Sequence, residues 1–193
     1  MIVAVLFVAD QVTKFMALGA LTHAFDTFGA GAMSFGTELE RFLTLKHPGT
    51  ARVVTVIPDF WHFRYAENPG AAFSFLGGAA SSIRTPFLLL VSLVAMVFIV
   101  IYYRRTGEKQ GLLRVALAMV FSGALGNFVD RVRFGYVIDF IDWHWFDKAT
   151  WPTFNIADAA ISVGVAFLLL DMLRQPKAQR AGAGTPAKAK GGG

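Results

Sequence analysis

Four long apolar segments alternate with polar connections along the chain. They cover residues 1–21, 85–103, 112–129 and 155–173. Each segment is close to the roughly 20 residues that a helix needs to cross about 30 Å of hydrocarbon. The pattern therefore predicts an α-helical integral membrane protein with four transmembrane helices.

The two long connections, 22–84 and 130–154, are rich in β-forming and aromatic residues. These residues recur in "VVTVIPDFWHFRYAEN", which a turn at "NPG" follows, and in "RFGYVIDFIDWHW", which alternates loosely. Such composition is typical of strands. We expect a small β element on the outer membrane face, with Trp and Phe side chains at the level of the lipid headgroups. Before it, residues 23–52 form an additional excursion, in which "TELERFLTLKH" has the pattern of a short amphipathic helix on the membrane surface.

Lysine and arginine gather at one end of the predicted bundle. The 104–114 connection and the tail beyond residue 174 are both basic. Cytoplasmic loops are enriched in these residues, so we place both segments, and with them the N-terminus, in the cytoplasm. We expect one membrane domain over residues 1–174. The remaining residues, 175–193, are rich in Gly, Ala, Pro and Lys and are predicted to form a disordered cytoplasmic tail.

Composition narrows the possible chemistry. The chain is 55% hydrophobic and 16% charged, with a mean hydropathy of +0.52, which is too apolar for an ordinary soluble domain. It has no cysteine, which excludes disulfides, cysteine nucleophiles and thiolate metal sites. The four histidines are dispersed through the outer connections and no pair has ligand spacing. We therefore expect no metal and no cofactor, and the modest net charge of +5 predicts no nucleic-acid partner.

Polar residues cluster at the outer ends of two predicted spans, where they are costly in lipid and often functional. Asn127, Asp130 and Arg131 share one helical face by their spacing. Asn155 and Asp158 are three residues apart at the start of the fourth span. A structural explanation exists for each group. The group on the third span can be explained as the charged end of a helix, beside glycines that allow close packing. The group on the fourth span can be explained as a helix N-cap followed by an acid in the first turn.

Two acids in the predicted strand form another candidate group. Asp139 shares a strand face with Val137 and Ile141, which is an unusual place for a solvated acid. Asp142 is a near neighbour and a rival candidate. The alternative for either residue is a strand side chain that faces water.

Three further polar residues precede these groups in the chain. Asp10 and Lys14 are four residues apart with the acid first, the favourable order, and we interpret them as an ion pair that braces the first span. Asn68 lies in a turn, where its side-chain amide could also face a bound peptide.

Together these side chains should meet at one membrane depth near the outer interface. Two carboxylates brought close share a proton, so one pKa rises and the other falls. An aspartic protease uses such a pair: one carboxylate activates water and the other polarises the scissile carbonyl. Two other functions fit the cluster, namely a small proton-coupled transporter and a non-enzymatic membrane assembly factor. We prefer the peptidase, because the sequence shows neither mid-membrane acids nor the internal repeats of transporters.

The motifs that carry these residues resemble those of the bacterial lipoprotein signal peptidases (signal peptidase II). "DQVTKF", "NPGAAFS", "GALGNFVDR", "GYVIDF" and "FNIAD" occur in that family's order and span nearly the whole chain. Each motif is weak alone, but five in order with compatible hydropathy are highly specific.

The resemblance implies a four-helix aspartyl endopeptidase of the bacterial inner membrane, with a β-cradle on its periplasmic face. It implies that the enzyme acts as a monomer among membrane lipids and cleaves lipoprotein precursors just before a diacylglyceryl-modified cysteine. The catalytic dyad becomes Asp139 and Asp158, which decides against Asp142. The residues that match the substrate groove, where the inhibitor globomycin is also expected to bind, are Asn68, Asn127, Arg131 and Asn155. The residues that match the supporting polar network are Asp10, Lys14 and Asp130.

Two departures from the family pattern carry expectations of their own. Only nine residues precede Asp10, fewer than the family's usual apolar run, so we expect a short first helix from a truncated chain or a late start. Residues 23–52 are longer than the usual connection to the β-cradle.

Overall fold

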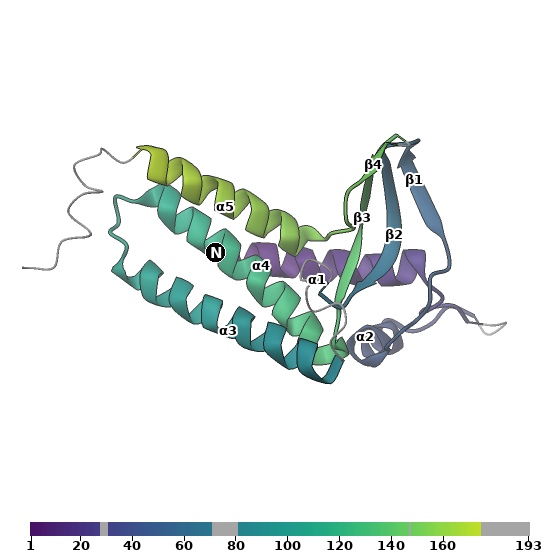
Figure 1. Ribbon diagram of the computed structural model, residues 1–193. Coiled ribbons are helices and arrows are strands. Elements are labelled where there is room, and N and C mark those ends of the chain that lie inside the picture. Colours follow the sequence, from purple (N-terminus) through teal and green to yellow (C-terminus); the bar gives the residue numbers. More distant parts are fainter. Residues whose placement is uncertain (28–30, 71–80, 147, 175–193) are drawn as a thin grey trace, which may run out of the picture.

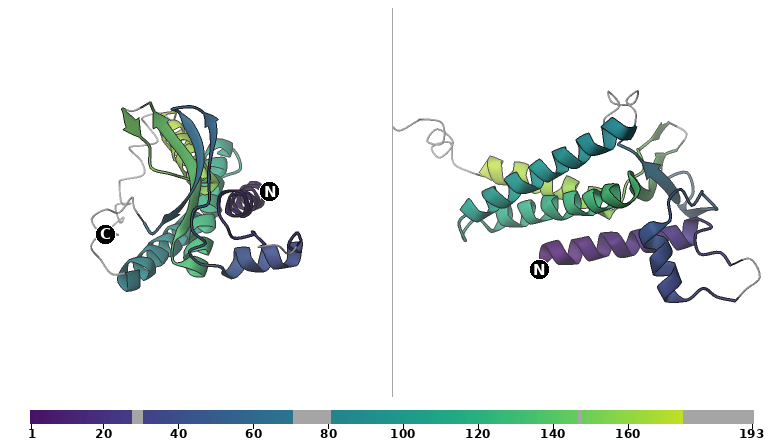
Figure 2. Two further views of the ribbon diagram at one scale, coloured as in Figure 1. Left: turned by 90° about the vertical axis from the view of Figure 1, so that its right-hand side faces the viewer. Right: turned by 90° about the horizontal axis from the view of Figure 1, so that it is seen from below.

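Four long helices form the body of the molecule. The computed structural model describes residues 1–27, 31–70, 81–146 and 148–174. These helices are α1 (Ile2–Leu21), α3 (Ser81–Arg105), α4 (Gly111–Phe134) and α5 (Ile156–Arg174). Each contains an apolar stretch long enough to cross a membrane. They run side by side, as Figure 2 shows in its right-hand view. The prediction of four transmembrane helices is confirmed, and the predicted tail, 175–193, lies outside the described residues.

A four-stranded antiparallel sheet lies at one end of these helices (Figure 1). Its strands, which pair in chain order, are β1 (Val53–Ile57), β2 (Trp61–Asn68), β3 (Val137–Trp145) and β4 (Ala149–Thr150). The pairing of β2 with β3 passes from Phe63 opposite Ile141 to Ala66 opposite Asp139. Strand β2 thus has one more residue than β3 over this interval, a β-bulge that bends the strand. The predicted small β element is confirmed.

The predicted surface helix is also present, with shifted bounds. Helix α2 (Phe35–Thr44) begins two residues before the expected start because the Ser34 hydroxyl accepts a hydrogen bond from the Thr37 amide and caps it. Phe42 is buried in the apolar core that joins α2 to the end of α1 and to the sheet. Arg41 donates a hydrogen bond to the Ala24 carbonyl. Helix α2 is therefore fixed to the sheet end of the molecule.

The outward surfaces of the long helices are apolar. On α3 the exposed side chains include Ile83, Leu90 and Phe98, and on α5 they include Leu169 and Leu173. Large apolar side chains exposed along a whole helix are unfavourable in water but stable in lipid. The chain is therefore a multi-pass membrane protein.

Helix α4 lies between its neighbours with very little space. A Cβ atom added at Gly123 would overlap the Ala157 carbonyl oxygen of α5, and one added at Gly126 would lie 2.6 Å from the Asp10 Oδ2 of α1. Small residues at helix interfaces let backbones approach closely in membranes. These two glycines therefore set the distance from α4 to α5 and α1, and with it the position of the polar residues nearby.

We expect Gly123→Ala to lower the thermal unfolding temperature of the detergent-solubilised protein. The added methyl group overpacks the interface with α5 at a cost of about 1–3 kcal/mol, which outweighs the gain in helix propensity of about 1 kcal/mol. Gly111→Ala is the matched control, because open space surrounds Gly111. Equal unfolding temperatures for the two variants would contradict the close-packing account.

Candidate active site

Asp139 lies on β3 with no exposed surface and accepts two hydrogen bonds from amide side chains. The Asn68 Nδ2, at the end of β2, donates to its Oδ2 at 2.8 Å. The Asn155 Nδ2, just before α5, donates to its Oδ1 at 2.7 Å. Three separate segments of the chain therefore fix this carboxyl group.

Asp158 is held by the start of α5. The Asp158 amide donates to the Asn155 side-chain oxygen at 2.9 Å, and the Asn155 amide donates to the Asp158 Oδ2 at 3.2 Å. This reciprocal pattern is a capping box, which supplies partners for amides that the first helical turn leaves unpaired. The Asn127 Nδ2 of α4 donates to the other oxygen, Oδ1, at 2.8 Å. Unlike Asp139, Asp158 is partly exposed.

The two carboxyl groups are coupled through Asn155, which caps the helix of one and donates a hydrogen bond to the other. Burial and, next in size, the charge of Asp158 raise the pKa of Asp139, while the amides of Asn68 and Asn155 act in the opposite direction; the resulting pKa is about 7. Asp139 can therefore gain or lose a proton near neutral pH.

A buried ion cluster supports this arrangement. The Lys14 Nζ on α1 lies 2.9 Å from the Asp10 Oδ2 and 2.8 Å from the Asp130 Oδ2, and all three side chains are almost fully buried. The remaining Asp10 oxygen accepts a hydrogen bond from the Ala157 amide of α5, and Asp130 accepts one from the Ile138 amide of β3. The cluster thus joins α1, α4, α5 and β3.

Arg131 is a cation beside both candidate carboxylates. It lies on α4, partly buried, and its charge interacts with those of Asp158 and Asp139. Its Nη1 donates to the Asn127 carbonyl at 3.4 Å, whereas its buried Nε has no hydrogen-bond partner among the described residues. This guanidinium can therefore donate to a group that enters the site.

Most of the residues singled out in the sequence belong to one hydrogen-bonded network. Asn127 connects its two halves, since its side-chain oxygen accepts from Asn155 at 3.2 Å and from Lys14 at 3.5 Å. Asp142 lies apart from this network. Residues alternate between faces along β3, so Asp142 points away from the face of Asp139. Its contacts are with Arg64 and His144.

Two residues of the network were not predicted from the sequence as members of the site. Gln11 donates to the Asp10 Oδ2 at 3.1 Å and to the Asp130 Oδ1 at 3.3 Å, and Arg133 donates to the Gln11 side-chain oxygen at 3.0 Å. A signal for Gln11 was present, because an amide within an apolar span needs a partner. No such signal existed for Arg133 at the end of its span.

The expectation that the histidines are dispersed is wrong for one pair. The ring centroids of His62 on β2 and His144 on β3 are 5.1 Å apart. The register between these strands cannot be read from the sequence, so the meeting of the two histidines could not be predicted.

An open pocket of about 510 Å³ lies beside Asn68, whose neighbours Glu67 and Pro69 line it. Arg84 and Thr85 at the start of α3 line it as well, together with residues at the end of α4. A larger cavity of about 600 Å³ lies at the opposite ends of α1, α3 and α4, among mainly apolar side chains and away from the carboxyl groups. Of these two, the pocket beside Asn68 is the one nearer to the residues that hold Asp139.

We expect Lys14→Met to lower the free energy of unfolding by about 3–5 kcal/mol, because it leaves two buried carboxylates without their cation. Thermal or denaturant unfolding in detergent measures the loss. Lys109→Met, at an exposed lysine between α3 and α4, is the control and should unfold like the parent protein. A Lys14→Met protein as stable as this control would show that the ion cluster is not a structural brace.

Comparison with known proteins places this arrangement among membrane peptidases. A family model described as signal peptidase (SPase) II, Peptidase_A8, matches residues 2–174. A lipoprotein signal peptidase of Anaeromyxobacter sp. (strain Fw109-5) is 45% identical over 190 residues, which cover 94% of this chain and 89% of that protein. One of Geobacter sulfurreducens (strain ATCC 51573 / DSM 12127 / PCA) is 50% identical over 124 residues, which cover 64% of this chain and 76% of that protein.

Two solved structures, each described as a bacterial membrane enzyme, share the fold. The first has a TM-score of 0.66 and 27% sequence identity, and the match covers 91% of this chain and 92% of that one. The second has a TM-score of 0.64 and 26% identity, and the match covers 98% of this chain and 92% of that one. The arrangement of membrane helices and sheet is therefore shared with experimentally determined membrane enzymes.

Proposed function

This chain belongs to the signal peptidase II family, and we propose that it removes signal peptides from lipoprotein precursors with Asp139 and Asp158 as its catalytic dyad. The substrate is a precursor whose cysteine carries a diacylglyceryl group, and the bond cleaved lies just before that cysteine. The observation that carries the proposal is the pair of carboxyl groups linked through Asn155. No metal or cofactor is needed for this chemistry.

The different surroundings of the two acids suggest their roles. Asp139 is buried, and its raised pKa favours the protonated form. Asp158 is partly exposed and can reach water. We assign Asp158 as the general base that takes a proton from the attacking water, and Asp139 as the acid that donates to the scissile carbonyl oxygen. When the tetrahedral intermediate collapses, the C–N bond breaks and the leaving nitrogen receives the proton held by Asp158. Asp139 takes back the proton of the hydroxyl group that re-forms the carbonyl, so both acids return to their starting states.

Neighbouring polar groups position the dyad and the peptide. Asn155 and Asn68 hold Asp139, and Asn127 holds Asp158. In the proposal the Nε of Arg131, which has no hydrogen-bond partner among the described residues, donates to a peptide carbonyl of the substrate. These four residues are the substrate-binding residues of the proposed site. The ion cluster of Lys14, Asp10 and Asp130 supports them.

The charges of the chain support an orientation in the bacterial inner membrane. The basic residues between and after the spans lie at the helix ends opposite the sheet; they include Arg104, Arg105, Lys109, Arg114 and Arg174. Positive residues favour the cytoplasmic side. The sheet and the dyad then face the periplasm, and both termini lie in the cytoplasm.

A lipidated substrate can reach this site laterally from the bilayer. Its transmembrane signal helix and acyl chains stay in lipid, while the scissile bond enters beside Asn68 at the membrane interface. All the proposed site residues come from one chain, so we propose that the enzyme acts as a monomer surrounded by membrane lipids.

We expect Asp139→Asn and Asp158→Asn each to lower the rate of precursor cleavage by at least about 100-fold, because each removes a proton-transfer group. The measurement is cleavage of a diacylglyceryl-modified precursor by purified enzyme, with and without globomycin, which should block the parent enzyme. Asp59→Asn, at an exposed acid in the turn between β1 and β2, is the control for the loss of a carboxylate. Full activity in either dyad variant, with unfolding temperatures near that of the parent, would falsify the assignment.

The rate should fall as pH rises through the apparent pKa of Asp139, since the proposed acid must be protonated. The Asn68 amide favours the ionised form of Asp139, so Asn68→Ala should raise this pKa and move the basic limb of the pH–rate profile to higher pH. Measurements of kcat/KM between pH 5 and 9 follow this limb. A limb that stays in place, or moves to lower pH, would mean that Asp139 is not the acid.

A further inference from the structure

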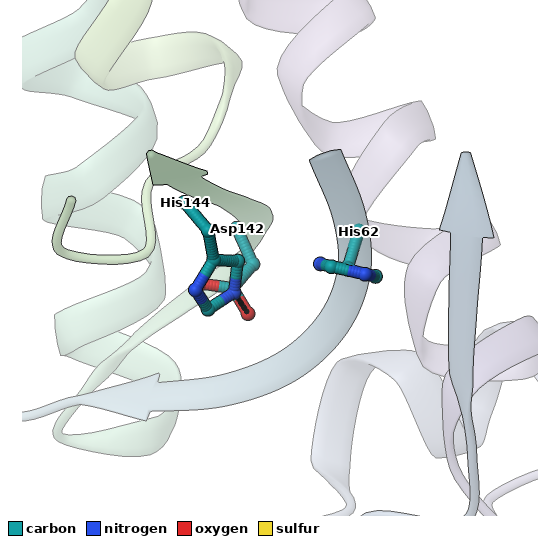
Figure 3. A group of neighbouring side chains, drawn as sticks. All are labelled: His62, Asp142 and His144. Carbon is teal, nitrogen blue, oxygen red and sulfur yellow. Dashed lines mark hydrogen bonds and ion pairs between the residues drawn. The ribbon is translucent and has the colours of Figure 1, made fainter. Parts of the chain in front are cut away.

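A second group of chemically active side chains lies on the sheet, apart from the dyad. His62 comes from β2, and Asp142 and His144 come from β3 (Figure 3). One potential ligand atom from each of the three residues lies within 4.8 Å of the others. No residue of the proposed peptidase site belongs to this group.

Strand geometry explains why these three side chains meet. His62 pairs directly with Asp142 across β2 and β3, so the two side chains project from the same face of the sheet. His144 is two residues beyond Asp142 and shares that face. Asp139 is three residues before Asp142 and projects from the other face. The sheet therefore separates the group from the dyad.

One oxygen of the Asp142 carboxylate lacks a hydrogen-bond donor within the described part of the chain. Asp142 is only 3% exposed. Its Oδ2 lies 3.2 Å from the Arg64 Nε, with which it forms an ion pair, and 2.9 Å from the His144 Nε2. Its Oδ1 is buried and has no hydrogen-bond partner among the described residues. A buried carboxylate oxygen without a donor is unfavourable, and a cation is a ligand that would satisfy it.

We propose that His62, Asp142 and His144 bind one divalent transition-metal ion, with Zn²⁺ as the best match. Two imidazole nitrogens and one carboxylate oxygen are a common ligand set for Zn²⁺, and they leave a fourth position open for water. His144 is 28% exposed at its side chain and His62 is partly exposed, so the ion can enter from solvent. The ion takes the place of the direct contact between His144 and Asp142.

Arg64 is the group that competes with the ion. Its guanidinium contacts Asp142, but its side chain is 46% exposed and can turn into water. The bound ion joins β2 to β3 beside the bulge at residues 63–66. The role of the site is structural. The ion fixes β3, the strand that carries Asp139, and binds on the face of the sheet opposite Asp139.

The test is titration of the purified full chain in detergent with Zn²⁺, after removal of metal by a chelator and without a polyhistidine tag. Isothermal titration calorimetry should show saturable binding of one ion per chain. His62→Gln and His144→Gln should each weaken binding at least about tenfold, since even residues behind the ligands change affinity by that much. His23→Gln is the matched control and should bind like the parent, because His23 pairs with Asp26 outside the group.

Two further measurements keep the test decisive if a variant folds poorly. Arg64→Gln should bind Zn²⁺ more tightly than the parent, because it removes the competing cation. Zn²⁺ should raise the unfolding temperature of the parent and of His23→Gln, but not of His62→Gln or His144→Gln. No saturable binding to the parent, unchanged affinity in both ligand variants, or weaker binding in Arg64→Gln would each overturn the proposal. None of these readouts depends on peptidase activity.

Discussion

The buried ammonium group of Lys14 is the interaction on which the rest of the site depends. A charge without exposed surface is stable only when it is paired and hydrogen-bonded, and here the pairing is with Asp10 and Asp130. Asp10 also accepts a hydrogen bond from the Ala157 amide at the start of α5 through its other oxygen, and Asp130 accepts one from the Ile138 amide of β3. These contacts hold α1, α4 and α5 in one register, whereas apolar contacts alone would let the helices slide past one another in lipid. The glycines of α4 make this possible, because a side chain at Gly126 would occupy the space of the Asp10 carboxylate.

The start of helix α5 and the position of Asp139 both depend on one residue, Asn155. Asn155 caps the helix through its side-chain oxygen and holds Asp139 through its side-chain nitrogen. An amide can do both because it carries an acceptor and two donor hydrogens. The sequence left two explanations for Asn155 and Asp158, namely a helix cap and part of a functional site. The two explanations are therefore compatible. A capping interaction that elsewhere only stabilises a helix end here also sets the distance between two carboxyl groups.

Much of this arrangement could be predicted, and the missing parts share a cause. Apolar segments of the length that crosses a membrane predicted the four helices, and β-forming composition predicted the sheet. Family motifs, not spacing, separated Asp139 from Asp142. The register between β2 and β3 was not predictable, because a bulge on β2 shifts it and depends on how the sheet packs on α1. For that reason the sequence could not show that His62 meets His144. The contact of Arg133 with Gln11 depends instead on how α4 packs against α1, which the sequence does not show either.

Strand β3 separates two environments, one shielded from water and the other in contact with it. On one face Asp139 must lose contact with water, because desolvation is the largest cause of its raised pKa. On the other face His144 keeps contact with water and Arg64 is exposed. A single strand can provide both, since alternate side chains point to opposite faces. A change of one residue in its register would exchange the two faces and remove Asp139 from both of its amide donors. The register of β3 is therefore as important to the proposed chemistry as the two aspartates themselves.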